Sequence, residues 1–211
     1  MLHRTVATIF CFAIVALVAA PAAANLPDLT LSSASVPANA VALYSIPDGS
    51  GQSFSGAMDA TGATVNGTIT VTLLNPIGNP IANFPLEDVW LESLDGNLGI
   101  CVTAHPDAIT DGAGQAFFTS FLNAGGNSFV ATGGGLRVMV LGSSLVGSDL
   151  AYNMLTPDLD NNGAVDLSDT VMFVPLYTGG GYDMSVDFFW DGNINLSDLV
   201  LYASGLNLIC P

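Results

Sequence analysis

The chain has 211 residues, of which 18 are aspartate or glutamate and two are lysine or arginine, for a formal net charge of −16 at pH 7. Binding to nucleic acid or to an anionic membrane surface needs a basic patch, and Arg137 is the only strong base after Arg4. The composition therefore excludes both function classes. It leaves a solvated acidic surface and cation binding as explanations, and eight of the 18 acidic residues fall within residues 157–198.

The first 24 residues predict a secretory signal peptide. His3 and Arg4 provide a positive start, residues 5–20 are apolar, and small residues of the A-x-A type end the segment near Ala24. An uncleaved anchor is the alternative, although a membrane span needs about 20 apolar residues and this segment is shorter. We therefore expect a secreted, extracellular or cell-surface protein with no membrane span after signal cleavage.

Residues 25–155 are predicted to be all β. Polar and apolar residues alternate in several short segments, and glycine, proline and asparagine separate these segments. Such spacing is typical of a β-sandwich. The expected strands lie at residues 64–74, 88–94, 114–122 and 135–142.

Two stretches in this half carry a resemblance. ITVTLLNPIGNPIANFPLEDVWLES and the later TDGAGQAFFTS are similar to the bacterial Ig-like repeats of surface proteins, in which comparable turns follow and precede strands. The similarity covers residues 63–122 and concerns turn chemistry. It implies an Ig-like β-sandwich with a structural or adhesive role and no catalysis.

Residues 158–169 place oxygen-bearing side chains at the spacing of a calcium loop. Carboxylates or amides occupy positions 1, 3, 5, 9 and 12, and Gly163 at position 6 permits a sharp turn. A hard cation such as Ca²⁺ takes six to eight oxygen ligands, including a backbone carbonyl at position 7. The predicted ligands are Asp158, Asp160, Asn162, Ala164, Asp166 and Asp169.

A second loop begins 29 residues later and ends in nearly the same letters, INLSDLV against VDLSDTV. This is an internal repeat of a loop followed by a helix. Phe189 stands at position 3, where an oxygen ligand is expected, so we predict a weaker second site. The predicted ligands are Asp187, Asp191, Asn193, Asn195 and Asp198.

The paired loops, each with aspartate at position 12, resemble the dockerin type I module over residues 157 to about 208. The resemblance implies a small α-helical module, here residues 156–211, that binds two Ca²⁺ ions and docks onto a cohesin-like or other extracellular protein. Leu167-Ser168 and Leu196-Ser197 replace the polar pairs typical of cohesin-binding dockerins. Pro175 is expected to end or kink the first helix near Val174.

Cys101 and Cys210 are the two cysteines that follow the predicted signal peptide. In an exported protein they are expected to form a disulfide, and two unpaired buried thiols are the alternative. The fold class expected overall is mainly β, an Ig-like β-sandwich followed by a small α-helical dockerin-like module with two calcium loops.

Two functions remain open. The first is a non-catalytic, exported calcium-binding protein whose module docks onto another protein or folds back on its own sandwich. The second is a glycan-binding or accessory component of a polysaccharide-degrading, cellulosome-like system, in which Trp90 or Trp190 would stack on sugar rings. His105 with a nearby aspartate is a weaker indication of catalysis, because no nucleophile motif accompanies it. We therefore expect no enzyme.

Overall fold

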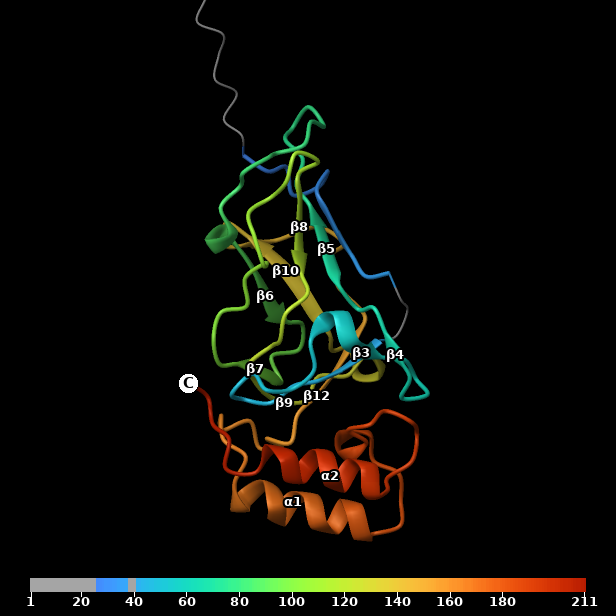
Figure 1. Cartoon of the computed structure of the whole chain (residues 1–211). Helices are drawn as coiled ribbons and strands as arrows, with labels where there is room; N and C mark the ends of the chain where they lie inside the picture. Colours follow the sequence, from blue (N-terminus) through green and yellow to red (C-terminus); the bar gives the residue numbers. More distant parts are fainter. Residues whose placement is uncertain (1–25, 38–40) are drawn as a thin grey trace, which may run out of the picture.

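The computed structural model describes residues 26–37 and 41–211, so the predicted signal peptide lies outside the described residues. The described part is mainly β and ends in two α-helices, α1 (Leu167–Thr178) and α2 (Leu196–Gly205). The strands occupy one end of the molecule and the helices the other (Figure 1). Among the described residues, no helix is long and apolar enough to cross a membrane.

The strands are short and form four small sheets, in the orders β1-β5-β8, β11-β10-β6, β12-β2-β3-β4 and β7-β9. The pairs are antiparallel except β12 with β2, which is parallel. The strands are β1 (Ser33–Ser35), β2 (Val41–Tyr44), β3 (Ala57–Met58), β4 (Thr64–Val65), β5 (Ile69–Thr72), β6 (Val89–Ser93), β7 (Leu98–Ile100), β8 (Gln115–Phe118), β9 (Ala124–Gly126), β10 (Leu136–Val140), β11 (Ser143–Ser144) and β12 (Tyr152–Leu155). Short 3₁₀ turns lie at η1 (Phe54–Gly56), η2 (Leu86–Asp88), η3 (Val130–Thr132) and η4 (Met184–Val186).

The alternating segments form strands where they were predicted, with one break. β6, β8 and β10 lie within residues 88–94, 114–122 and 135–142. The segment 64–74 is divided into β4 and β5, because the hydroxyl of Tyr152 donates a hydrogen bond to the carbonyl of Gly67 between them. Only glycine fits there, since a Cβ would overlap that hydroxyl.

β2 separates two hydrophobic cores. Its four residues are all buried, and successive side chains point to opposite faces of a strand. Val41 and Leu43 join the core of the strand region, whereas Ala42 and Tyr44 join a second core beneath it. The second core is shared with the C-terminal third of the chain through Val165, Phe173, Val186, Phe188 and Tyr202.

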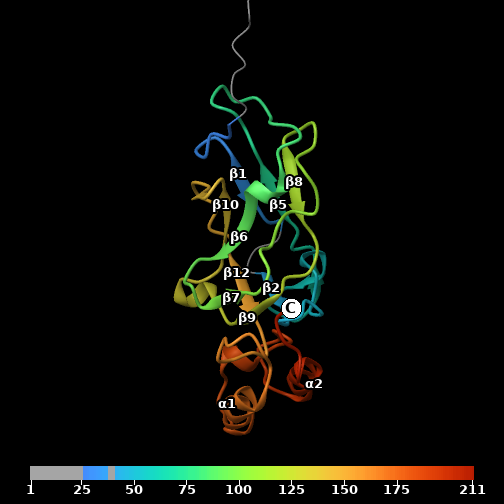
Figure 2. The same ribbon diagram turned by 90° about the vertical axis from the view of Figure 1, so that its left-hand side faces the viewer.

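The helical end therefore packs directly on the strands, as the perpendicular view also shows (Figure 2). β12 ends at Leu155, and the first predicted ligand, Asp158, follows three residues later. The backbone carbonyl of Asp158 accepts a hydrogen bond of 2.8 Å from Gly126 N, at the end of β9. The Tyr44 hydroxyl donates a 2.6 Å bond to the carbonyl of Leu201 in α2.

Each helix has one buried face that repeats at helical spacing. In α1 the buried residues are Asp169 and Phe173, and in α2 they include Asp198 and Tyr202. Of the two expectations for Pro175, that it ends the first helix near Val174 is wrong, because α1 continues through Pro175 to Thr178. Proline removes one backbone donor, but α1 extends only three residues beyond it.

The predicted disulfide is confirmed. Cys101, which follows β7, is bonded to Cys210 near the C-terminus, with the two Cα atoms 5.4 Å apart and a sequence separation of 109 residues. The C-terminus consequently lies beside β7 and β9 rather than beyond the helices (Figure 1). The disulfide thus ties the end of the helical segment to the strand region.

Candidate metal centre

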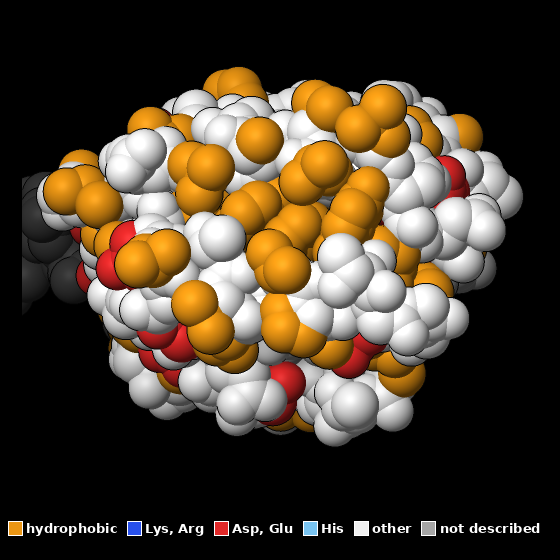
Figure 3. Space-filling model, turned by 90° about the horizontal axis from the view of Figure 1, so that it is seen from below, with side chains coloured by type: hydrophobic (Ala, Val, Ile, Leu, Met, Phe, Trp, Pro, Cys, Tyr) orange, Lys and Arg blue, Asp and Glu red, His pale blue; other side chains and the backbone are white. Residues whose placement is uncertain are grey.

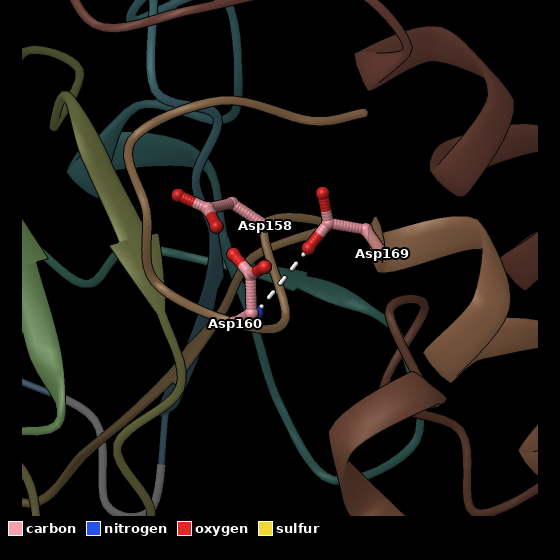
Figure 4. A group of neighbouring side chains, drawn as sticks. All are labelled: Asp158, Asp160 and Asp169. Carbon is pink, nitrogen blue, oxygen red and sulfur yellow. Dashed lines mark hydrogen bonds between the residues drawn. The ribbon is translucent and has the colours of Figure 1, made fainter. Parts of the chain in front are cut away.

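Three carboxylates of the first loop converge. Asp158, Asp160 and Asp169 each offer one oxygen, and these oxygens all lie within 4.8 Å of one another (Figure 4). Asp158 and Asp160 lie in the loop that follows β12, and Asp169 lies in the first turn of α1. Carboxylate oxygens so arranged match the oxygen-rich coordination that Ca²⁺ prefers.

Backbone N–H groups of the loop hold the carboxylates of Asp158 and Asp169, at positions 1 and 12, in place. Asp158 accepts hydrogen bonds from the backbone N–H groups of Asn162 at 3.1 Å and Gly163 at 2.8 Å. Gly163 has a φ of 85°, which glycine adopts without strain, so the glycine at position 6 permits the sharp turn as predicted. Asp169 accepts bonds from the N–H groups of Leu159 and Asp166 at 2.7 and 2.8 Å, which fixes its carboxylate over the loop.

The centre has an electrostatic deficit. Asp158 and Asp169 are fully buried, at 0% exposure, and a buried carboxylate is costly unless a positive charge accompanies it. Burial, together with the neighbouring charges of Asp169 and Asp160, raises the pKa of Asp158 to about 6, although the backbone hydrogen bonds that it accepts lower it. The chain has no lysine, and Arg137 instead donates to the carbonyl of Leu94. A bound cation would supply the missing charge.

The remaining predicted ligands of this loop are less directly placed. The Asn162 side chain accepts a bond from Ala164 N at 2.9 Å, and Asp166 caps α1 by accepting from Ser168 N at 2.7 Å. Asp166 lies outside the convergent group, and position 9 of such loops often reaches the ion through water. The C-terminal tail runs beside Ala164, but its hydrogen bonds are made by Gly163 and Val165, the neighbours of Ala164. These bonds therefore do not use the Ala164 carbonyl, which is the predicted ligand at position 7.

The second loop repeats the backbone pattern of the first, which confirms the internal repeat. Asp187 accepts bonds from the N–H groups of Asp191 at 3.2 Å and Gly192 at 2.9 Å. Asp198 accepts from Phe189 N at 2.9 Å and Asn195 N at 2.8 Å. Burial raises the pKa of Asp198, as it does at Asp158.

The side chains of the second loop differ from those of the first. Phe189 occupies position 3 and packs on the β3–β4 turn, where a Cβ at Gly62 would lie 2.8 Å from its ring. The Tyr182 hydroxyl donates a 2.9 Å hydrogen bond to Asp187, and this bond occupies one of the two carboxylate oxygens of Asp187. Asn193 and Asn195 bond to the backbone of their own loop. Among the described residues, the acidic side chains of the second loop do not form a convergent group of three like that of the first loop.

Three groups that shape the site are not predicted by the loop pattern. Tyr182 lies outside both predicted loops, but its hydroxyl contacts Asp187. Gly125 lies in β9, outside the predicted strands, and faces Asp158 so closely that a Cβ would overlap the carboxylate. The tail at residues 207–210 pairs with the first loop. Only Gly125 had a sequence indication, namely the Gly-Gly pair, since glycine marks close backbone approach.

The side chains considered for other chemistry have structural partners. The His105 Nδ1 lies 2.8 Å from the Val89 carbonyl, and Asp107 accepts from Thr119 and Ser120. The Trp190 ring is stacked on Phe129, with ring centroids 6.1 Å apart.

The comparisons with known proteins do not identify a family for this chain. No protein-family model, curated protein or solved structure matches the chain significantly. Function is therefore inferred from the residues of the loops and their surroundings.

The raised pKa of Asp158 predicts an unusual pH dependence for the cation-free protein. Folding raises this carboxyl from its ordinary value of 3.8 to about 6, so its contribution to stability is greatest when it is protonated and is lost as pH rises through about 6. We expect the free energy of unfolding, from urea denaturation of chelator-stripped protein, to increase from pH 7 to pH 5. The increase should be smaller in Asp158→Asn, and equal slopes in both proteins would contradict this origin.

Substitution of Phe189 by aspartate is expected to strengthen the second site. The change restores an oxygen ligand at position 3, at the cost of the contact between the ring and the β3–β4 turn. Calorimetric titration of Ca²⁺ should show a gain of about tenfold in the weaker affinity, or a new binding event. Phe189→Asn is the matched neutral control and should give a smaller gain. An unchanged titration would show that Tyr182 or the loop backbone, rather than the missing ligand, limits this site.

Proposed function

We propose that this is an exported, non-catalytic calcium-binding protein with an Ig-like β-sandwich and a dockerin-like C-terminal module. The observation that carries the proposal is the group of converging carboxylates, two of them fully buried, in a chain without lysine. A Ca²⁺ ion at the first loop would neutralise these charges and join β12 to α1. The second loop would bind Ca²⁺ more weakly, because Phe189 replaces a ligand.

Calcium would serve here as an internal staple. The loops lie between the strands and the helices, and the helices share a hydrophobic core with β2. A ligand that binds only the folded state stabilises that state, by about 2.7 kcal/mol at a concentration 100 times its Kd. Dissociation constants of extracellular calcium modules fall at about 10⁻⁴ to 10⁻³ M, so the staple would be loaded outside the cell.

The outer face of the helices supports docking to another extracellular protein. Leu167 and Leu196 occupy the same repeat position and are 75% and 67% exposed, and Val171 and Val200 are 66% and 60% exposed. The only charged residues within the helices, Asp169 and Asp198, are buried. Seen from below, apolar side chains gather across this face (Figure 3). A patch of this kind typically marks an interaction site.

The partner should present an uncharged, apolar surface to this face. The two helices offer no exposed charge for a salt bridge, and a net charge of −16 disfavours association of two copies. A cohesin-like module fits this description only if its recognition surface is apolar, because the polar pairs of cohesin-binding dockerins are replaced by Leu-Ser in both repeats.

Thermal unfolding of the chelator-stripped protein tests the calcium proposal. We expect the Tm to rise with Ca²⁺ between 0.1 and 10 mM, the range of weak extracellular sites, and to rise less with Mg²⁺, which demands a tighter octahedral site. Docking is tested by binding of a candidate cohesin or surface protein to the calcium-loaded chain, with Val171→Glu/Val200→Glu as the variant. Binding that this variant retains would contradict the proposed face, and no change of Tm with Ca²⁺ would contradict the staple.

A further inference from the structure

The C-terminal tail is part of the first loop's framework. Asn207 N donates to the carbonyl of Val165 at 2.8 Å, and Val165 N donates to the carbonyl of Leu208 at 2.9 Å. Cys210 N donates to the carbonyl of Gly163 at 2.8 Å. The tail thus lies as a short antiparallel strand along the middle of the loop, opposite the segment that carries positions 6 to 8.

The strand region holds the same loop from another side. Gly99 N in β7 donates to the Asn161 side chain at 3.1 Å, and that side chain donates to the carbonyl of Asn97 at 3.3 Å. Gly126 N in β9 bonds to the carbonyl of Asp158. The Cys101–Cys210 disulfide connects these two supports, because Cys101 follows β7 and Cys210 ends the tail.

The second loop lacks such a framework. In the part of the chain that the structure describes, no backbone hydrogen bond from another segment reaches residues 192–194, the equivalents of residues 163–165. The disulfide also lies at the first loop, where a Cβ at Gly163 would be 3.0 Å from the Cys210 sulfur. The two repeats therefore differ in their covalent surroundings as well as in their ligands.

We propose that the Cys101–Cys210 disulfide sets the cation affinity of the first loop and leaves the second loop unaffected. This inference rests on the proposed calcium function. Without the covalent bond, the segment after α2 is held to the loop by a few backbone hydrogen bonds, and segments held in this way open locally at little cost in free energy. The loop would then have to be ordered when the cation binds, and that lost freedom lowers affinity.

The consequence is an oxidation-dependent site. Reduction by a dithiol breaks the S–S bond with two electrons, leaves two cysteine thiols and converts the dithiol to its own disulfide. Reducing compartments keep the cysteines as thiols, whereas the exterior allows the bond. The first loop would therefore reach its full affinity only in the oxidised chain, after export.

Calcium titration of oxidised wild-type chain and of Cys101→Ser/Cys210→Ser tests the proposal. We expect the affinity of the first site to fall about tenfold in the variant, within the range usual for coupled sites. Phe189→Asp is added to the wild-type chain and to the double cysteine variant as a control. The strengthened second site should bind Ca²⁺ with equal affinity in the two chains. Equal affinity of the first site in both chains would overturn the proposal.

A second measurement, made on the wild-type chain, tests the proposal even if the double variant folds poorly. Linkage requires that Ca²⁺ shift the equilibrium of the disulfide with dithiothreitol by the same factor by which the disulfide shifts Ca²⁺ binding. Saturating Ca²⁺ should thus make the wild-type disulfide about tenfold harder to reduce, and Asp160→Asn should lose most of this protection. A disulfide equally reducible with and without Ca²⁺ overturns the inference alone. Absence of Ca²⁺ binding to the oxidised wild type overturns the proposed function as well.

Discussion

Replacing Asp158 with asparagine is expected to change stability in opposite directions with and without calcium. In the cation-free protein at pH 7, asparagine removes an ionised carboxylate that is buried beside two others, so the free energy of unfolding should stay equal or increase. With 10 mM Ca²⁺, the variant should lose most of the stabilisation that the wild type gains, about 2.7 kcal/mol if the wild-type Kd is about 0.1 mM. Urea denaturation under both conditions measures the two effects.

Asp187→Asn is the matched control, because Asp187 occupies position 1 of the second loop and accepts the equivalent backbone bonds. Its calcium-dependent loss should be smaller, since that site lacks a ligand at position 3. If Asp158→Asn destabilised the cation-free chain by 2 kcal/mol or more, its hydrogen bonds rather than its charge would dominate, within the usual cost of an unsatisfied buried group. The electrostatic deficit inferred for the centre would then be wrong.

Phe173→Ala is expected to cause the largest loss of stability from a single substitution in the helical end, about 3 to 5 kcal/mol. Phe173 is 1% exposed, and its ring stacks on Tyr202 with ring centroids 4.1 Å apart and on Phe188 at 6.0 Å. Alanine would leave a cavity among aromatic rings that belong to α1, α2 and the second loop. Chemical denaturation in the presence of saturating Ca²⁺ would measure the loss.

Val171→Ala, two residues earlier on α1 and 66% exposed, is the control and should cost less than about 0.5 kcal/mol. Because the second core also includes Tyr44 and Ala42 of β2, the Phe173 variant should unfold in one transition with the strands. A separate early transition of the helices, seen by far-ultraviolet circular dichroism, would show that the shared core does not couple the two parts.

The sequence was most informative where a pattern repeats. Alternation predicted β6 and β10, and the spacing of Asp158, Gly163 and Asp169 predicted a loop whose carboxylates do converge. The near-identity of the two loop endings predicted an internal repeat, and the hydrogen bonds of the two loops repeat accordingly. These features are local, and short-range chemistry determines them.

Contacts between distant segments could not be predicted in this way. The tail pairs with the first loop although nothing in its composition specifies a partner, and the Gly67 break in the long predicted strand depends on Tyr152, 85 residues later. In each case tertiary packing selects a conformation that local propensity leaves open.

The parallel pairing of β2 with β12 bears on how the protein would withstand tension. β2 lies near the beginning of the described chain, and β12 leads into the helical end. A pull between the start of β2 and the helices would act on opposite ends of this pair, so the rungs Tyr152–Val41 to Leu155–Tyr44 would be loaded together rather than opened one by one. The Cys101–Cys210 bond would further limit how far residues 101–210 could extend. A surface protein held between two attachments would gain mechanical resistance from this arrangement.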